Sequence, residues 1–277
     1  MTVSLDDKLF DLAGNVAVVT GGAGILCSTL CRGLAREGVK VAILDLNLPT
    51  AEGLAKDIIS SGGEAIAILC DVCDKESLKS AAQKLMSLHG EVDILINGAG
   101  GNSVKATTME GLAFFDIPEN ALRWVFDLNL MGTMLASQVF GRIMAGQKKG
   151  NILNISSMNA YRPLTRIPAY SAAKAAVSNF TQWLAVYLAQ EYSPNIRVNA
   201  IAPGFFLTDQ NHYIMIDKEN GVLTERGQTI IAHTPMKRFG IPEDLMGVVL
   251  WLVSPASSFV TGIVVPIDGG FSAFSGV

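Results

Sequence analysis

Short apolar runs alternate with longer amphipathic stretches along the whole chain, and this alternation constrains the fold more than any other feature of the sequence. Apolar strands without polar alternation, separated by helices, are typical of a parallel sheet covered on both faces. Right-handed crossovers then predict an α/β fold with one doubly wound sheet. The expected strands are Val16–Thr20, Val39–Asp45, Glu64–Cys70, Asp93–Asn97, Asn151–Ser156, Ile196–Ile201 and Ile263–Ile267.

The stretches between these runs predict helices, except in two places. We expect a helix from the glycines after Thr20 to Glu37, and others over Thr50–Ser61, Lys75–Leu88, Pro118–Ala145, Ala169–Glu191 and Glu243–Val253. Gly101–Asp116 and Phe205–His233 fit neither a strand nor a crossover. They follow predicted strands, so they should lie at the carboxyl edge of the sheet, where ligands bind. The second is expected to form a substrate lid, residues 205–233, within a single domain spanning 1–277.

Composition narrows the class of protein. Charged residues make up only 17% of the 277 residues and hydrophobic ones 49%, which indicates that part of the surface is buried in an oligomer. The net charge of −4, without a basic run, argues against nucleic acid as a partner. Neither a signal peptide nor a membrane-spanning run is visible, so we expect a cytoplasmic chain with reduced thiols. Cys70 and Cys73 have the spacing of metal ligands, but one such pair predicts no metal site.

The first predicted strand runs into Gly21-Gly22-Ala23-Gly24 and then into a helix. Glycines let backbone amides approach a pyrophosphate, and the helix N-terminus at Ile25 and Leu26 favours its negative charge. Asp45 ends the next strand, 21 residues after Gly24. A carboxylate there accepts hydrogen bonds from a ribose and repels a 2′-phosphate, so NAD is favoured over NADP. Further expected dinucleotide contacts come from residues at later strand ends: Asp71, Val72, Asn97, Ala99 and Gly100.

Tyr170 and Lys174 share one face at the start of a predicted helix. An ammonium beside a phenol should lower the phenol's pKa from about 10, which makes tyrosine a usable acid or base near neutral pH. Ser157 follows a strand end, 13 residues earlier. Its hydroxyl could hold a substrate oxygen during hydride transfer.

Taken together, the motifs resemble the short-chain dehydrogenase/reductase family over nearly the whole chain. They are Thr20-Gly21-Gly22-Ala23-Gly24, Asn97-Gly98-Ala99-Gly100, Asn129, Ser157, Tyr170-x-x-x-Lys174 and Pro203-Gly204-x-x-x-Thr208. The resemblance implies a Rossmann fold and an NAD-dependent enzyme acting on CH–OH groups. The glycine turn is one residue shorter than the family's usual one, which leaves open which amides touch the pyrophosphate.

The resemblance also implies a role for each matching residue. Tyr170 would be the general acid/base, Ser157 would orient the substrate oxygen, and Lys174 would lower the tyrosine pKa and bind the nicotinamide ribose. Asn129 would hold a water in a proton relay to Lys174. The nicotinamide would be positioned by one segment, represented by Pro203, Gly204, Phe206 and Thr208. A homotetramer is implied as well, with the helices at Asn129 and Tyr170 paired across a two-fold axis.

Segments around Ser157, Tyr170, Pro203 and the C-terminus are similar to the sugar-acid dehydrogenases, which include D-mannonate oxidoreductases. The implied reaction is the reversible oxidation of D-mannonate by NAD⁺, which gives D-fructuronate and NADH. A sugar acid needs a cation for its carboxylate and several hydroxyl partners. Candidates in the loops are Asn102, Lys105, Asn159, Arg166 and His212, with Arg166 or Lys105 expected on the carboxylate. A gluconate 5-dehydrogenase, a neutral polyol dehydrogenase and a non-catalytic NADH sensor remain alternatives.

Overall fold

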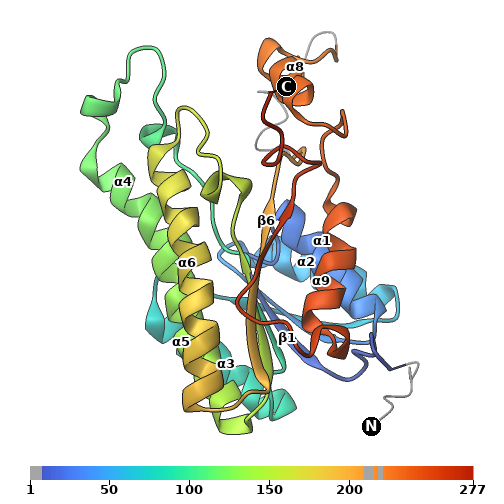
Figure 1. Ribbon diagram of the computed structural model, residues 1–277. Coiled ribbons are helices and arrows are strands. Elements are labelled where there is room, and N and C mark those ends of the chain that lie inside the picture. The colour runs from blue at the N-terminus through green and yellow to red at the C-terminus, as the bar shows by residue number, and fades with distance from the viewer. Residues whose placement is uncertain (1–7, 209–214, 218–220, 277) are drawn as a thin grey trace.

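The computed structural model describes residues 8–208, 215–217 and 221–276. Seven parallel strands form one sheet in the order β3-β2-β1-β4-β5-β6-β7, which confirms the predicted doubly wound fold (Figure 1). The order reverses between β1 and β4, and such a switch point opens a crevice at the carboxyl ends of the strands. The strands are β1 (Val16–Thr20), β2 (Lys40–Asp45), β3 (Glu64–Leu69), β4 (Ile94–Asn97), β5 (Gly150–Ile155), β6 (Ile196–Pro203) and β7 (Val264–Ile267).

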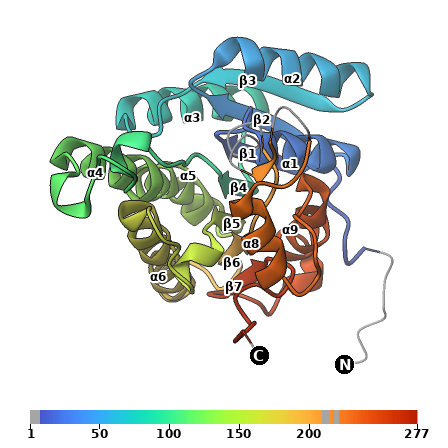
Figure 2. The same cartoon turned by 90° about the horizontal axis from the view of Figure 1, so that it is seen from above.

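Helices cover both faces of the sheet, as Figure 2 shows from above. One face packs against α1 (Ile25–Arg36), α2 (Leu48–Ser60) and α9 (Met246–Val253), and the other against α3 (Lys75–His89), α5 (Gly132–Gln147) and α6 (Pro168–Glu191). Neighbouring residues of one strand alternate between the two cores: Val19 of β1 joins the first and Val18 the second. Both faces are therefore apolar, which explains the unbroken apolar runs in the sequence.

The helix expected over Pro118–Ala145 is divided by a π-helical turn. α4 (Glu119–Phe126) leads into this turn at Asp127–Met131, and α5 follows directly. A π turn adds a residue to the helical repeat and is frequent at functional sites. Here it carries Asn129, whose side chain is fully buried.

The long stretch after β6 contains a helix that the sequence did not predict. Residues Glu225–His233 form α8, which begins after Thr224, whose hydroxyl accepts a hydrogen bond from the Gly227 amide. The helix has only nine residues and contains Gly227, so its sequence shows little helical periodicity. The other unassigned stretch holds two short 3-10 turns, η1 (Val104–Ala106) and η2 (Phe114–Asp116). Closure of 205–233 as a lid stays a prediction.

Across the described part of the chain, every helix is too short or too polar to cross a bilayer.

Candidate active site

The glycine turn after β1 is held against the loop after β4. Gly21 has a φ of +60°, and a Cβ there would lie 2.7 Å from the Cα of Ala99. Only glycine adopts this backbone so close to another chain segment without strain. Thr20 ties the two loops together, because its hydroxyl oxygen accepts hydrogen bonds from the amides of Gly98 (3.1 Å) and Ala99 (3.3 Å). Sequence patterns alone indicate no such role for Thr20, although it directly precedes the turn.

Helix α1 begins at this turn, and no side chain caps its first amides. Gly24 occupies the N-cap position, so no side chain can accept from the first-turn amides, such as those of Ile25 and Leu26. A phosphate group suits such a helix N-terminus. Cys27 stands where the G-x-G-x-x-G pattern has its third glycine, and its sulfur packs on Gly98: a Cβ at Gly98 would lie 2.2 Å from that sulfur. The residues present therefore fit a dinucleotide pyrophosphate.

Asp45 closes the far side of this turn. Its Oδ2 accepts a hydrogen bond from the Ala23 amide at 3.0 Å, and its Oδ1 accepts one from the Asn47 amide at 2.9 Å. Each carboxylate oxygen has a second lone pair. The side chain is thus fixed beside the glycine turn and can still accept hydrogen bonds from ribose hydroxyls.

The expected adenosine contacts divide into two groups. Asp71 lies partly exposed at the loop after β3, with Val72 packed under it against Gly132. Asn97 is instead buried, and its Nδ2 donates to Ser137 and Asn154. Any contact of Asn97 with a dinucleotide would come from its backbone.

Lys174 lies inside the protein rather than on its surface. Only 4% of the residue is exposed, and its Nζ donates to the Ile155 carbonyl at 2.8 Å. Burial lowers the pKa of the amine to about 8. A Cβ at Gly100 would lie 3.1 Å from Nζ and 2.7 Å from the Asn129 Oδ1. The absence of a side chain at Gly100 therefore lets Lys174 and Asn129 approach the same loop.

Asn129 locks that loop in place. Its Oδ1 accepts from the Gly101 amide at 3.1 Å, and its Nδ2 donates to the Gly101 carbonyl at 2.7 Å. The π turn thereby fixes the strand end that borders Lys174. The water relay expected of Asn129 stays a prediction.

Tyr170 shares this site with Lys174 and Ser157. The Lys174 Nζ lies 5.7 Å from the centre of the Tyr170 ring. Burial raises the pKa of the phenol, while a hydrogen bond with Ser157 lowers it in part. The prediction that Lys174 lowers the Tyr170 pKa is therefore wrong in direction. The amine lies beside the ring and donates its hydrogen bond to a carbonyl, so desolvation of the phenol has the larger effect on its pKa.

The segment after β6 is pinned to β7. The Gly204 amide donates to the Ile267 carbonyl at 2.9 Å, and a Cβ at Gly204 would lie 2.5 Å from that of Asp268. Pro203 precedes it as the last residue of β6, and Thr208 is the last described residue before 209–214. The Phe206 side chain is buried against Gly240, so only its backbone is placed to meet a cofactor.

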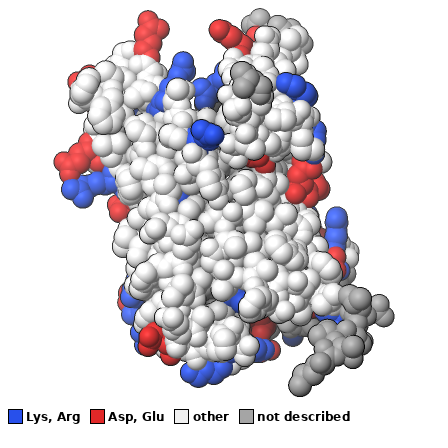
Figure 3. Space-filling view, viewed as in Figure 1, with Lys and Arg blue, Asp and Glu red and all other residues white. Residues whose placement is uncertain are grey.

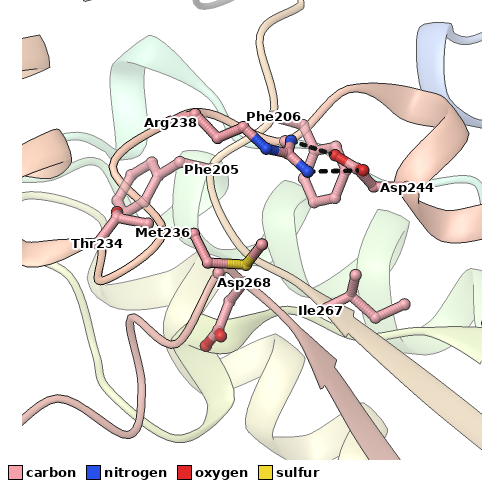
Figure 4. Close-up of a pocket in the computed structure, with 10 residues that line it drawn as sticks. Phe205, Phe206, Thr234, Met236, Arg238, Asp244, Ile267 and Asp268 are labelled. Carbon is pink, nitrogen blue, oxygen red and sulfur yellow. Dashed lines mark hydrogen bonds and ion pairs between the residues drawn. The ribbon is translucent and has the colours of Figure 1, made fainter.

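Behind Phe205 and Phe206 lies a pocket of about 180 Å³ (Figure 4). Arg238 and Asp244 form an ion pair on its wall. None of Ser157, Tyr170 and Lys174 lines it. It is therefore a separate cavity under the end of β6, distinct from the site of the three catalytic candidates.

The substrate candidates differ in their freedom to bind. Asn159 is buried and supports Ser157, because its Nδ2 donates to the Ser157 hydroxyl at 3.1 Å and its Oδ1 accepts from the Leu164 amide at 3.1 Å. Asn102 donates to the Thr107 hydroxyl. Lys105 and Arg166 are exposed. His212 lies outside the described residues.

Comparison with known proteins identifies the family. Residues 24–272 match a family model described as enoyl-(acyl carrier protein) reductase. An uncharacterized oxidoreductase of Bacillus subtilis (strain 168), UxuB, is 51% identical over 96% of this chain and 98% of its own length. The chain belongs to the short-chain dehydrogenase/reductase family. The resemblance seen in the sequence is confirmed.

Two further members show how substrates vary at lower similarity. A crystal structure from Haemophilus influenza, provisionally named a D-mannonate oxidoreductase and holding NAD, is 47% identical with a TM-score of 0.91, covering 96% of this chain and 98% of that one. The 7α-hydroxysteroid dehydrogenase of Escherichia coli (strain K12) is 33% identical over 94% of both chains. This short-chain dehydrogenase/reductase is thus an oxidoreductase acting on alcohol groups with a nicotinamide dinucleotide.

The lowered pKa of Lys174 gives a stability test. The amine titrates at about 8 when folded and at 10.5 when unfolded. Between these values the unfolded state binds more protons, so the free energy of unfolding should rise with pH, by about 3 kcal/mol in full. Urea unfolding at pH 7 and pH 10 should show most of this rise in the native protein relative to Lys174→Met. Parallel pH profiles for both proteins would contradict a buried, lowered lysine.

Proposed function

We propose that this protein is an NAD(H)-dependent oxidoreductase that interconverts a sugar-acid alcohol and its keto form, with D-mannonate and D-fructuronate as the pair. The observation that carries the oxidoreductase chemistry is the convergence of Tyr170, Lys174 and Ser157 at the carboxyl edge of the sheet. When bound, the nicotinamide supplies or accepts the hydride.

Each of these residues has a different part in proton transfer and substrate binding, which follows from its surroundings. Tyr170 carries its proton at neutral pH, since a phenol's ordinary pKa is about 10 and burial raises it further, so it acts as the acid that protonates the oxygen of a keto substrate. In the reverse direction its deprotonated form takes the proton of the alcohol. Ser157 is held by Asn159 and orients the substrate oxygen by hydrogen bonding. Lys174, held by the Ile155 carbonyl, would bind the nicotinamide ribose.

Asp45 supports the choice of NAD over NADP. Its carboxylate is fixed by the Ala23 and Asn47 amides at the end of β2. A 2′-phosphate placed there would meet a like charge. The NAD held by the similar Haemophilus protein agrees with this preference.

The sugar-acid substrate is supported by likeness and by the polar loops. The provisional D-mannonate name of that Haemophilus protein, at 47% identity, points to an aldonate. Cationic side chains at the loops after β4 and β5, Lys105 and Arg166, suit a carboxylate. A neutral polyol would form no ion pair with these cations.

A homotetramer is the assembly we propose, built partly on the outer face of α6. Ring pairs Phe180–Trp183, Trp183–Tyr187 and Tyr187–Tyr192 form an aromatic row there, and 57% of Trp183 is exposed. Figure 3 shows that the middle of this side of the molecule carries almost no charge. Apolar surface of this kind marks an interface between subunits.

The reaction is tested by NADH formation over a panel of D-mannonate, D-gluconate, D-sorbitol and a 7α-hydroxy bile acid. D-Mannonate should give the highest kcat/KM. Tyr170→Phe should lower kcat for it by about a thousandfold, as loss of a general acid/base does, with unchanged NADH binding by fluorescence. Fastest turnover of the bile acid or sorbitol would overturn the sugar-acid assignment, and an active Tyr170→Phe protein would overturn the chemistry.

Cofactor choice is tested at Asp45. Asp45→Asn removes the charge and retains a hydrogen-bond acceptor, so kcat/KM with NADP should rise relative to NAD by about tenfold or more. Asp57→Asn, on the exposed side of α2, is the matched control and should leave the ratio unchanged. An unaltered ratio in Asp45→Asn would contradict ribose recognition by this carboxylate.

The assembly is tested by light scattering on a size-exclusion column. Trp183→Glu should convert tetramers to smaller species at micromolar concentration, because a buried charge opposes an apolar interface. Leu88→Glu, at an exposed leucine on α3, should leave the mass unchanged. A tetrameric Trp183→Glu protein would argue against α6 as an interface.

A further inference from the structure

Two arginines interact electrostatically although they lie far apart in the sequence, one in the loop before α6 and the other in α8. Arg166 lies in the loop between β5 and α6, four residues before Tyr170, and Arg226 lies in the first turn of α8. Burial and the nearby Arg166 charge both lower the pKa of the Arg226 guanidinium. The Arg166 charge thus disfavours the charged form of Arg226, and a bound anion would relieve this effect.

Arg226 has hydrogen-bonding capacity that the protein does not use. Its Nε is buried and has no hydrogen-bond partner. Among the ion pairs between described residues, none includes Arg166 or Arg226. A buried donor without a partner is costly, and native structures retain few of them.

Arg197 shows how this protein treats a buried guanidinium that serves structure alone. Its Nη1 donates to the Ser257 hydroxyl at 2.8 Å, and its Nη2 donates to the Ser254 carbonyl at 3.0 Å. Its charge therefore has fixed acceptors within the fold. The contrast with Arg226 points to a ligand as the missing acceptor.

The position of Arg166 is fixed by its backbone. Its φ is +79°, a backbone conformation that residues other than glycine rarely adopt. Its carbonyl accepts a hydrogen bond from the Thr108 amide at 2.8 Å, which ties it to the loop after β4. The pair thus stands where the loops after β4, β5 and β6 meet. In Figure 3, Lys and Arg side chains line the notch between the two upper lobes of the molecule, one formed around α4 and the other around α8.

We propose that Arg166 and Arg226 together bind the carboxylate of the substrate, which makes Arg226 a specificity residue of the enzyme. A guanidinium offers two parallel N–H donors that match the two oxygens of a carboxylate. The carboxylate would supply the acceptor that the Arg226 Nε lacks and would offset the repulsion between the two arginines. A neutral sugar would leave the Arg226 Nε without a charged acceptor and the arginine repulsion unrelieved, so the pair selects acids. This assignment rests on the proposed sugar-acid function.

The test compares Arg226→Gln and Arg166→Gln with the native enzyme on D-mannonate and on D-mannitol. Each substitution should raise the ratio of the KM for mannonate to the KM for mannitol by about tenfold to a hundredfold, as loss of a charge-assisted hydrogen bond does. The double variant should lose less than the product of the two single effects, because both side chains bind one group. Arg226→Lys, which keeps the charge without the planar fork, should recover only part of the selectivity.

Two controls locate the effect. Arg36→Gln, at the exposed end of α1 on the opposite edge of the sheet, should leave the KM ratio unchanged. Lys105→Gln tests the rival cation in the loop after β4. A large change in Lys105→Gln with none in Arg226→Gln would overturn the assignment, as would equal KM changes for acid and neutral substrate.

Failure of the proposed sugar-acid function can be distinguished from failure of the arginine site. If the native enzyme oxidised no sugar acid, the sugar-acid function would fall, and the arginine pair would still be tested by malonate as a competitive inhibitor of whichever alcohol is oxidised. Malonate should inhibit the native enzyme, with an inhibition constant about tenfold higher in Arg226→Gln. Equal inhibition of both proteins, or none of either, would overturn the anion site.

Discussion

The burial of the Lys174 ammonium is the interaction on which the rest of the site depends. An amine held away from water must have fixed acceptors, and here the Ile155 carbonyl at the end of β5 is one of them. The neighbouring loop must also come close without filling the space, which explains Gly100. The Asn129 side chain then bonds both the amide and the carbonyl of Gly101, so the π turn that carries Asn129 has a direct structural purpose.

The same loop connects the site of Lys174 and Asn129 to the glycine turn after β1. Gly98 packs on the Cys27 sulfur, and Ala99 lies so close to Gly21 that neither glycine could carry a side chain. Thr20 fixes the spacing through two hydrogen bonds. A displacement of the turn would therefore reach Lys174 through a short stretch of backbone. Cys27 contributes to this contact, because its sulfur packs on Gly98 and leaves no space for a side chain there.

Much of this could be predicted from the sequence, and the exceptions have physical causes. Strands and long helices were predicted because both faces of the sheet and one face of each helix are apolar. α8 was missed because a nine-residue helix with an internal glycine has little periodicity. The direction of the Tyr170 pKa shift was wrong because sequence spacing places Lys174 near the ring but says nothing of desolvation. Likewise, nothing in the sequence shows that Asn97 and Phe206 turn their side chains into the core, or that the Arg226 Nε is left without an acceptor.

In the function proposed above, the rigid sheet edge supplies the chemistry and the loops decide the substrate. Tyr170, Lys174 and Ser157 are placed by strand ends and by α6, whose positions follow from packing. Arg166 and Arg226 are placed by loop backbone, including a left-handed residue and a short helix. A relative at 33% identity that acts on a steroid is consistent with this division, because loops tolerate change that the sheet does not. If the proposed arginine pair binds the substrate carboxylate, exchange of a few loop cations would change the substrate preference and leave Tyr170, Lys174 and Ser157 in place.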